Sequence, residues 1–258
     1  MHNSDEQNWW HRLTISVQRH LFGPWELDLS GAMLQAGQRW SMRRVLMVFL
    51  LSHIPPIFLF VWSEQTAGEI PWTAMVLLHP LLLLLLIRLA APRETSQIWS
   101  SLKDISSYRL LDMGLKWGII FRVITFATVL LQVTVGLEPP PSNNPLQLAE
   151  QILSPFEQGF IALIVVVLVP AAEEIFYRKI LYQSLGNYVG LAAAATLSSA
   201  IWALLHGSML LVPALFALGI CLTILYESTK NIWVPIAAHM AFNLTSFILL
   251  WVLPHTAG

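Results

Sequence analysis

The sequence contains few charged residues, little cysteine and no excess of positive charge. Only 11% of its 258 residues are charged, whereas 56% are hydrophobic, and the mean hydropathy is +0.63. Because soluble domains carry about 25% charged residues, this composition predicts an all-α protein that crosses a membrane several times. The net charge of −1 gives no support for a nucleic-acid partner.

The scarcity of cysteine limits the chemistry of the chain. Cys221 is the single cysteine and lies in an apolar stretch, so an intramolecular disulfide and a thiolate metal cluster are both excluded. The first 40 residues also lack the compact apolar core of a signal peptide. Membrane insertion is therefore expected to depend on the spanning segments themselves.

Seven apolar stretches approach the length that is needed to cross ~30 Å of hydrocarbon. They are Val45–Trp62, Trp72–Leu89, Trp117–Leu137, Phe160–Tyr182, Tyr188–Leu205, Met209–Tyr226 and Ile232–Leu253. The sequence therefore predicts a polytopic helical bundle with about seven transmembrane helices.

The polar stretches divide the chain into four parts. Residues 1–44 form a cytoplasmic or interfacial segment, residues 45–137 a front part with three spans, residues 138–158 an external loop rich in proline, and residues 159–258 a back part with four spans. Apolar side chains recur at every fourth position of the first segment, at Trp9, Leu13, Val17 and Leu21. This pattern favours an amphipathic helix on the membrane surface, and a tail without regular structure is the alternative.

All 14 basic residues fall on the same side of an alternating path of seven spans. They are Arg12, Arg19, Arg39, Arg43, Arg44, Arg88, Arg93, Lys103, Arg109, Lys116, Arg122, Arg178, Lys179 and Lys230. The opposite connections contain acidic residues without Lys or Arg. By the positive-inside rule, we expect a multi-pass protein of the cell (inner) membrane with a cytoplasmic N-terminus and an external C-terminus.

Two adjacent glutamates lie inside the fourth apolar stretch, where an unpartnered charge is costly. Glu174 and Arg178 are four residues apart, which places them on one helix face and predicts a structural ion pair. Glu173 points about 100° away and has Phe176 and Tyr177 as its neighbours one turn on. A desolvated carboxylate without a cationic partner is suited to act as a general base.

Three more polar residues occur in the apolar stretches of the back part, namely His206, His239 and Asn243. With Glu173 they provide a carboxylate, two imidazoles and a carboxamide, which suffice to activate a water and hold an oxyanion. Each has a simpler interpretation when taken alone, as a packed histidine or an asparagine that bonds between helices. Three other histidines, His53, His79 and His255, lack polar companions at helical spacing and are expected only to pack.

These residues form three motifs in order: Glu-Glu-x-x-x-Arg, an aromatic residue followed four positions later by His, and His-x-x-x-Asn. This order resembles the CPBP family, the intramembrane proteases of CAAX-protein and bacteriocin processing, over about residues 155–250. Trp202 stands where the family usually has Phe, and we interpret it as a packing variation.

The resemblance implies a role for each matching position. Glu173 would be the general base and His206 would help to hold the attacking water, while His239 and Asn243 would stabilise the oxyanion. The expected function is an intramembrane endopeptidase that cleaves a membrane-associated or lipidated peptide or protein in the lipid bilayer.

The family is often described as metal-dependent, which makes a zinc ion an alternative. Its ligands would be Glu173, His206 and His239. The sequence has no His-Glu-x-x-His motif, and asparagine is a poor zinc ligand. We therefore expect no cofactor and a water that is activated by glutamate.

Two other functions use the same polar residues. A catalytically silent relative could be a scaffold or a self-immunity protein for a bacteriocin, but such a protein could have lost any one of the four polar residues. A transporter with a proton relay is less consistent with the sequence, which lacks interrupted helices in two related halves.

The predicted spans place two site residues at different depths. Glu173 lies nine residues before Tyr182, and His206 lies 18 residues beyond Tyr188. At 1.5 Å per residue these are ~14 Å and ~27 Å from the inner side, too far apart to share a water. Either residues 188–195 do not cross the membrane, or the boundaries are displaced by a turn or two.

Overall fold

A computed structural model describes residues 9, 12, 40–66, 72–136, 154–206 and 208–252, and within these residues all regular structure is helical. The surface helix predicted within residues 1–44 lies almost wholly outside the described residues. Most of the predicted loop 138–158 does too, although a helix already begins at Pro155.

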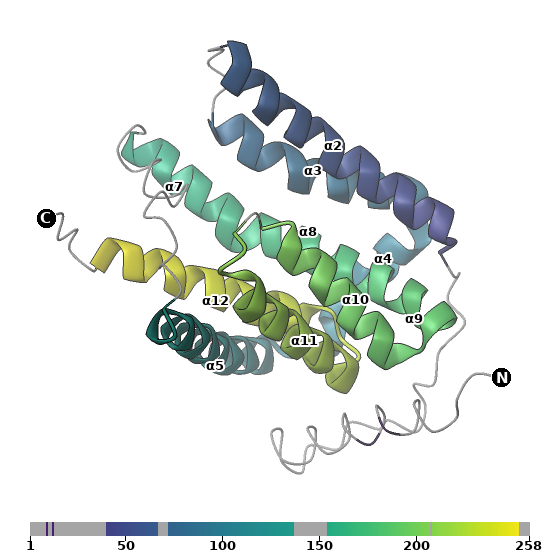
Figure 1. The fold of residues 1–258 in the computed structure, drawn as a ribbon. Helices are drawn as coiled ribbons and strands as arrows, with labels where there is room; N and C mark the ends of the chain where they lie inside the picture. The colour runs from purple at the N-terminus through teal and green to yellow at the C-terminus, as the bar shows by residue number, and fades with distance from the viewer. Residues whose placement is uncertain are drawn as a thin grey trace, which may run out of the picture.

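One long helix of 35 residues, Pro155–Val189, runs through the middle of the protein (Figure 1). It is composed of α7 (Pro155–Leu163), the π-helical η2 (Ile164–Leu168), α8 (Val169–Glu174), the π-helical η3 (Ile175–Tyr182) and α9 (Gln183–Val189). We call these five segments the central helix. Its start is fixed by a capping box between Ser154 and Glu157.

The central helix ends at Gly190, whose φ of +83° is readily adopted only by glycine. The next helix, α10, spans Leu191–Leu204. The predicted boundary at Tyr182 and Tyr188 is therefore wrong, since the chain stays helical through both residues and turns only at Gly190. Glu173 lies 17 residues before this turn and His206 lies 16 residues after it, or ~25 Å on either side, so the two depths agree.

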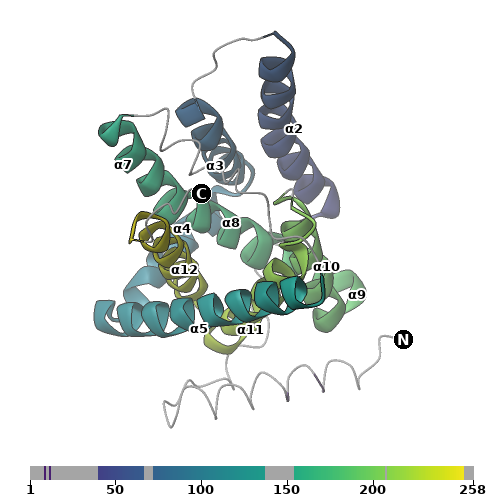
Figure 2. The same ribbon diagram turned by 60° about the vertical axis from the view of Figure 1, so that its left-hand side comes forward.

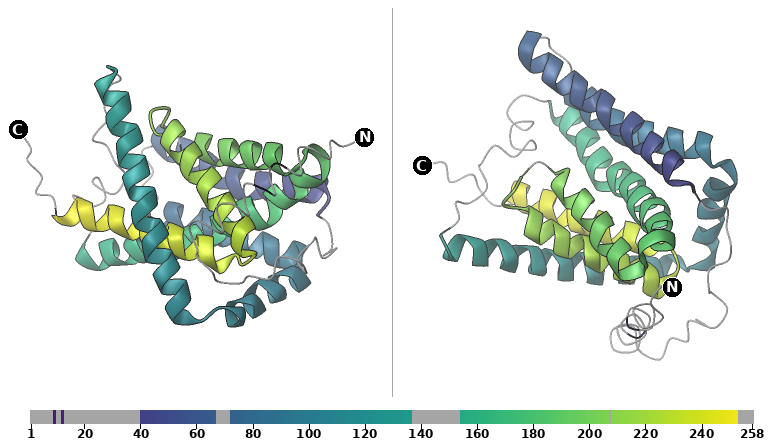
Figure 3. Two further views of the ribbon diagram at one scale, coloured as in Figure 1. Left: turned by 90° about the horizontal axis from the view of Figure 1, so that it is seen from below. Right: turned by 45° about the vertical axis from the view of Figure 1, so that its right-hand side comes forward.

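The remaining helices surround the central helix on several sides. They are α2 (Met42–Thr66), α3 (Trp72–Ala90), α4 (Pro92–Ser100), α5 (Ser107–Thr134), α11 (Val212–Thr229) and α12 (Trp233–Val252). The antiparallel pair α2 and α3 lies along one side of the central helix, and α12 and α5 lie on the other (Figures 1 and 2). Figure 3 shows α5 crossing α12 and the short α4 leading into α5.

Small residues bring α5 and α12 together. Gly114 and Gly118 are four residues apart on α5, and an added Cβ would lie 2.9 Å from Ala237 Cβ at the first and 2.5 Å from Ala241 Cβ at the second. Small residues at this spacing are typical of close helix packing in membranes. Since α12 also carries His239 and Asn243, a helix of the front part supports the helix with two site residues.

Four helices in the described residues are long and apolar enough to cross a membrane, or five if the bent pair Val76–Ala90 and Thr95–Asp104 counts as one span. Two shorter apolar helices, Leu191–Leu204 and Trp233–Leu249, accompany them. The prediction of a multi-pass helical membrane protein is confirmed, while the number of seven spans is not.

The orientation in the membrane stays a prediction, and one of its supports is corrected. Arg122 was assigned to a polar connection, but α5 begins at Ser107 and Arg122 lies near the middle of the helix. Its guanidinium donates to Phe242 O at 2.7 Å and to Ser246 Oγ on α12. It is therefore a helix-to-helix contact rather than a loop charge.

Candidate active site

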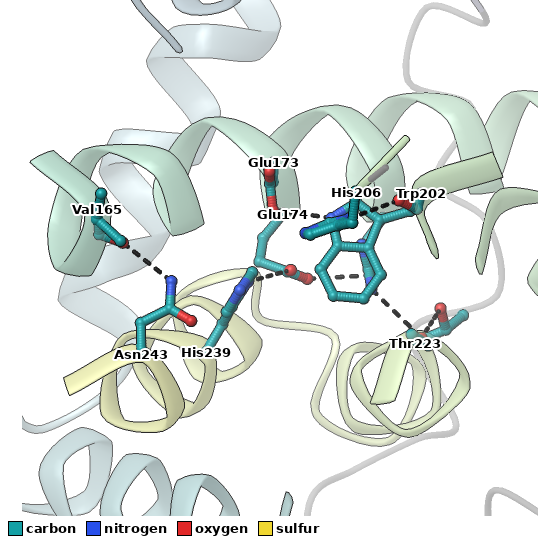
Figure 4. Close-up of polar contacts among 10 residues, drawn as sticks. Val165, Glu173, Glu174, Trp202, His206, Thr223, His239 and Asn243 are labelled. Carbon is teal, nitrogen blue, oxygen red and sulfur yellow. Dashed lines mark hydrogen bonds and ion pairs between the residues drawn. The ribbon is translucent and has the colours of Figure 1, made fainter. Parts of the chain in front are cut away.

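Glu173 lies in α8 with only 9% of its surface exposed. The indole Nε1–H of Trp202, on α10, donates a hydrogen bond of 2.8 Å to Glu173 Oε2 (Figure 4). The other oxygen, Oε1, has no hydrogen-bond donor among the described residues. The interpretation of Trp202 as a packing variation is therefore wrong, because a phenylalanine has no group that could make this bond.

The indole ring of Trp202 also has two neighbours. The Arg178 guanidinium carbon lies 4.9 Å from the ring centroid, and the His206 ring meets it edge-on at 4.6 Å. Trp202 thus lies against a cation and an imidazole while its N–H holds Glu173.

His206 lies just beyond the end of α10 and is exposed. Its Nδ1 is 2.8 Å from Trp202 O. Since a carbonyl oxygen can only accept, Nδ1 carries the proton, and a neutral ring then has its lone pair on Nε2. Glu173 and His206 interact electrostatically, and a carboxylate beside an imidazole lone pair can take a proton from a water.

Glu174 points away from Glu173, toward α12 (Figure 4). Its Oε1 is 2.9 Å from His239 Nδ1, and its Oε2 is 3.1 Å from Arg178 Nε. Glu174 and Arg178 are 0% and 1% exposed. The residues expected to form a structural ion pair thus lie together, and Glu174 also orients His239, which the spacing alone did not predict.

Asn243 is held by a backbone carbonyl of the central helix. Its Nδ2 donates to Val165 O at 2.9 Å. In the π-helical η2, Val169 N–H bonds to Ile164 O, so the next N–H in that register would bond to Val165 O. That position is Pro170, which has no N–H. Asn243 therefore bonds to the carbonyl that the proline leaves free.

The four predicted catalytic residues fall into two groups. Glu173 and His206 meet at Trp202, while His239 and Asn243 lie along α12 and are held by Glu174 and Val165. The groups adjoin, because the Trp202 and His239 rings are 5.6 Å apart and Glu173 interacts electrostatically with both histidines.

Two histidines of the front part were wrongly expected to lack polar companions. His53 Nε2 on α2 lies 3.2 Å from His79 Nε2 on α3 and 3.2 Å from Tyr177 Oη on the central helix. No spacing along the chain could reveal this cluster, because its members come from three helices. The third histidine of that prediction, His255, lies outside the described residues.

No three His, Cys, Asp or Glu side chains within the described part of the chain converge so that they could hold a metal ion. Of the alternative zinc ligands, His239 directs Nδ1 at Glu174 and Glu173 is bonded to Trp202. The donor set present does not fit a metal, so no step is derived through one.

Residues 155–245 match the profile of the Type II CAAX prenyl endopeptidase Rce1-like family. The resemblance to the CPBP family is confirmed. The chain is also 24% identical over 231 residues to the membrane-embedded CAAX protease MroQ of Staphylococcus aureus (strain USA300), across 83% of this chain and 90% of that protein. No solved structure matches.

A second relative is the "Putative membrane peptidase YdiL" of Bacillus subtilis (strain 168), which is 36% identical over 74 residues. That match covers 29% of this chain and 30% of the relative. Together these matches support an intramembrane protease activity, and hence a peptide or protein substrate in the membrane.

Proposed function

We propose that the protein is an intramembrane endopeptidase that hydrolyses a peptide bond in a membrane-associated or lipidated peptide or protein, with a water activated by glutamate. The observation that carries the proposal is the geometry around Glu173. One carboxylate oxygen is held by the Trp202 indole at 2.8 Å, which leaves Oε1 for a water. His206 presents the lone pair of Nε2 at the same place.

In this mechanism, the water oxygen attacks the carbonyl carbon of the scissile bond and one water proton passes to Glu173. The tetrahedral intermediate then collapses, the C–N bond breaks, and the amine nitrogen takes up the proton. The products are a carboxylic acid and an amine, and Glu173 returns to its carboxylate form. General base catalysis of this kind contributes ~10²–10⁴-fold to the rate.

The oxyanion of the intermediate would be stabilised from α12. Asn243 Nδ2 has two N–H groups, of which Val165 O engages one, so the other is left for the oxyanion. Glu174 is 2.9 Å from His239 Nδ1, and its charge supports a doubly protonated His239 whose Nε2–H also donates. With such a ring, Glu173, Glu174, Arg178 and His239 carry two negative and two positive charges, which balances the cluster.

The test compares protein N-termini in membranes of cells that express the wild type or Glu173→Ala at matched abundance. We expect a small set of N-termini to disappear with Glu173→Ala, and these identify the substrate directly. The control is Asp104→Ala, which removes an exposed carboxylate and should leave the set intact. If wild type and Glu173→Ala give coinciding sets, the protein is a scaffold or self-immunity protein rather than a protease.

A further inference from the structure

The two histidines of the front part form a hydrogen-bonded pair that the proposed mechanism does not use. His53 is 9% exposed and is packed by Phe49, with ring centroids 4.3 Å apart. Its Nδ1 is 2.8 Å from Phe49 O, and its Nε2 is 3.2 Å from His79 Nε2. Both ring nitrogens of a buried imidazole are thus engaged.

These contacts fix the tautomers of both rings. Phe49 O can only accept, so His53 Nδ1 is the protonated nitrogen and His53 Nε2 of a neutral ring is an acceptor. His79 Nε2–H then donates to His53 Nε2. A neutral His79 consequently has its lone pair on Nδ1, where it can accept a proton.

The pair lies against the face of the central helix that carries Glu173. Tyr177, which contacts His53, is one turn beyond Glu173 on that helix. Helix α3 packs directly against α8. His79 interacts electrostatically with Glu173 and with His206, so an imidazole from the front part adjoins the carboxylate and imidazole of the back part.

We propose that His79, positioned by His53, relays the proton from Glu173 to the amine that leaves. This inference rests on the proposed protease function. After the attack, the protonated Glu173 gives its proton to His79 Nδ1, and the resulting imidazolium is held through Nε2–H by His53. His79 then donates this proton to the nitrogen as the C–N bond breaks, and both Glu173 and His79 return to their starting forms.

A relay separates the two tasks that a single carboxylate would otherwise perform. Glu173 is held at Oε2 by Trp202, which limits how far its carboxyl group can follow the proton toward the amine. An imidazole that gains a proton on one nitrogen while it donates from the other suits this transfer. The front part would then supply a group that acts in the reaction.

Substitutions at His79 distinguish a relay from a structural role. His79→Gln retains an amide N–H that can donate to His53 but cannot carry a proton, whereas His79→Phe removes both properties. We expect both variants to slow the cleavage identified with Glu173→Ala by about 100-fold, and only His79→Phe to lower the thermal stability. A residue with a purely structural role would retain cleavage in His79→Gln.

The pH dependence of cleavage is a second readout. The titratable groups that face His79 are His53 from α2, Glu173 and Tyr177 from the central helix, and His206 from the end of α10. In His79→Gln the pH–rate profile should lose one limb, while Tyr177→Phe should retain both limbs with a smaller loss of rate. Cleavage by His79→Gln at the wild-type rate with an unchanged profile would overturn the relay.

An experiment without substrate separates this inference from the proposed function. Nitrogen-15 NMR of the histidine rings in the full-length protein in lipid should show His53 protonated at Nδ1 and His79 at Nε2. The His79 signals should move with Glu173→Gln and stay in place with Asp104→Asn. Insensitivity to Glu173→Gln overturns the relay even if the protein is a protease. Coinciding N-termini for wild type and Glu173→Ala overturn both proposals.

Discussion

The front part of the protein carries no recognisable motif, whereas the back part carries three. The family profile begins at residue 155 and covers the central helix and α10 to α12. Yet the front helices contact that site from two sides, since α2 and α3 bring His53 and His79 toward Glu173, and α5 packs along α12.

The difference shows that a motif identifies the chemical groups but not what holds them. Each back-part residue has a partner that follows from packing: Trp202 for Glu173, Glu174 for His239, and Val165 O for Asn243. The contacts from the front part are of the same kind. The predictions below test how far the two parts depend on each other, from the largest expected effect to the smallest.

The largest effect is expected inside the back part, at its buried ion pair. Glu174→Gln leaves Arg178 charged and without its anionic partner at 1% exposure, which costs about 3–5 kcal/mol. We expect a large loss of accumulation and of thermal stability, measured by immunoblotting of membranes and by heating the purified protein. The front part offers no charge of comparable burial among its described helices.

A double variant provides the control for this prediction. Glu174→Gln combined with Arg178→Met removes both charges and should restore much of the accumulation, although His239 loses its carboxylate and cleavage stays low. Wild-type stability of the single variant would contradict the assignment of a buried ion pair.

The next effect tests whether the front part supports the back part. Gly118→Ala places a Cβ 2.5 Å from Ala241 Cβ and 2.9 Å from Phe242 N, so α5 and α12 must separate. Overpacking of this kind costs about 1–3 kcal/mol, and cleavage should fall because Asn243 lies on the displaced helix.

The matched control for this change is Gly159→Ala, where an added Cβ meets nothing within 4 Å. It should be neutral in both thermal stability and cleavage. Ala241→Gly added to Gly118→Ala should recover part of the loss, as contacting residues do in a double-mutant cycle. If Gly118→Ala behaves like Gly159→Ala, the front part does not hold α12.

A smaller effect is expected from the loss of one hydrogen bond at Glu173. Trp202→Phe retains a ring against Arg178 but removes the N–H that bonds to Glu173 Oε2. A hydrogen bond to a charged group contributes about 1.5–3 kcal/mol, so the cleavage rate should fall by about 10-fold or more with little change in accumulation.

The same substitution at Trp233 is a matched control, because its indole Nε1–H donates to Ile98 O on α4 at 2.8 Å. Trp233→Phe should lower thermal stability slightly and leave the cleavage rate unchanged. Equal cleavage rates in the two variants would mean that Trp202 only packs, as its motif position first indicated.

The motifs predicted the helical class and the polar residues of the back part because buried polar groups stand out in apolar helices. Helical spacing likewise predicted which glutamate meets Arg178. The sequence did not reveal that Gly190 rather than Tyr188 ends the central helix, since apolar residues continue on both sides of it. It also could not reveal that His53 meets His79, because that contact depends on how α2 and α3 pack together.

The smallest effect is expected from metal removal. Glu173 is engaged by Trp202 and His239 by Glu174, and two imidazoles of the front part bond to each other, so neither part presents three ligands toward one point. A chelator such as 1,10-phenanthroline should therefore leave the rate of cleavage in isolated membranes unchanged, with a known zinc protease as the positive control. A loss of cleavage that added zinc restores would contradict the glutamate mechanism. It would also mean that Glu173, His206 and His239 turn toward a common ion, which requires His239 to leave Glu174.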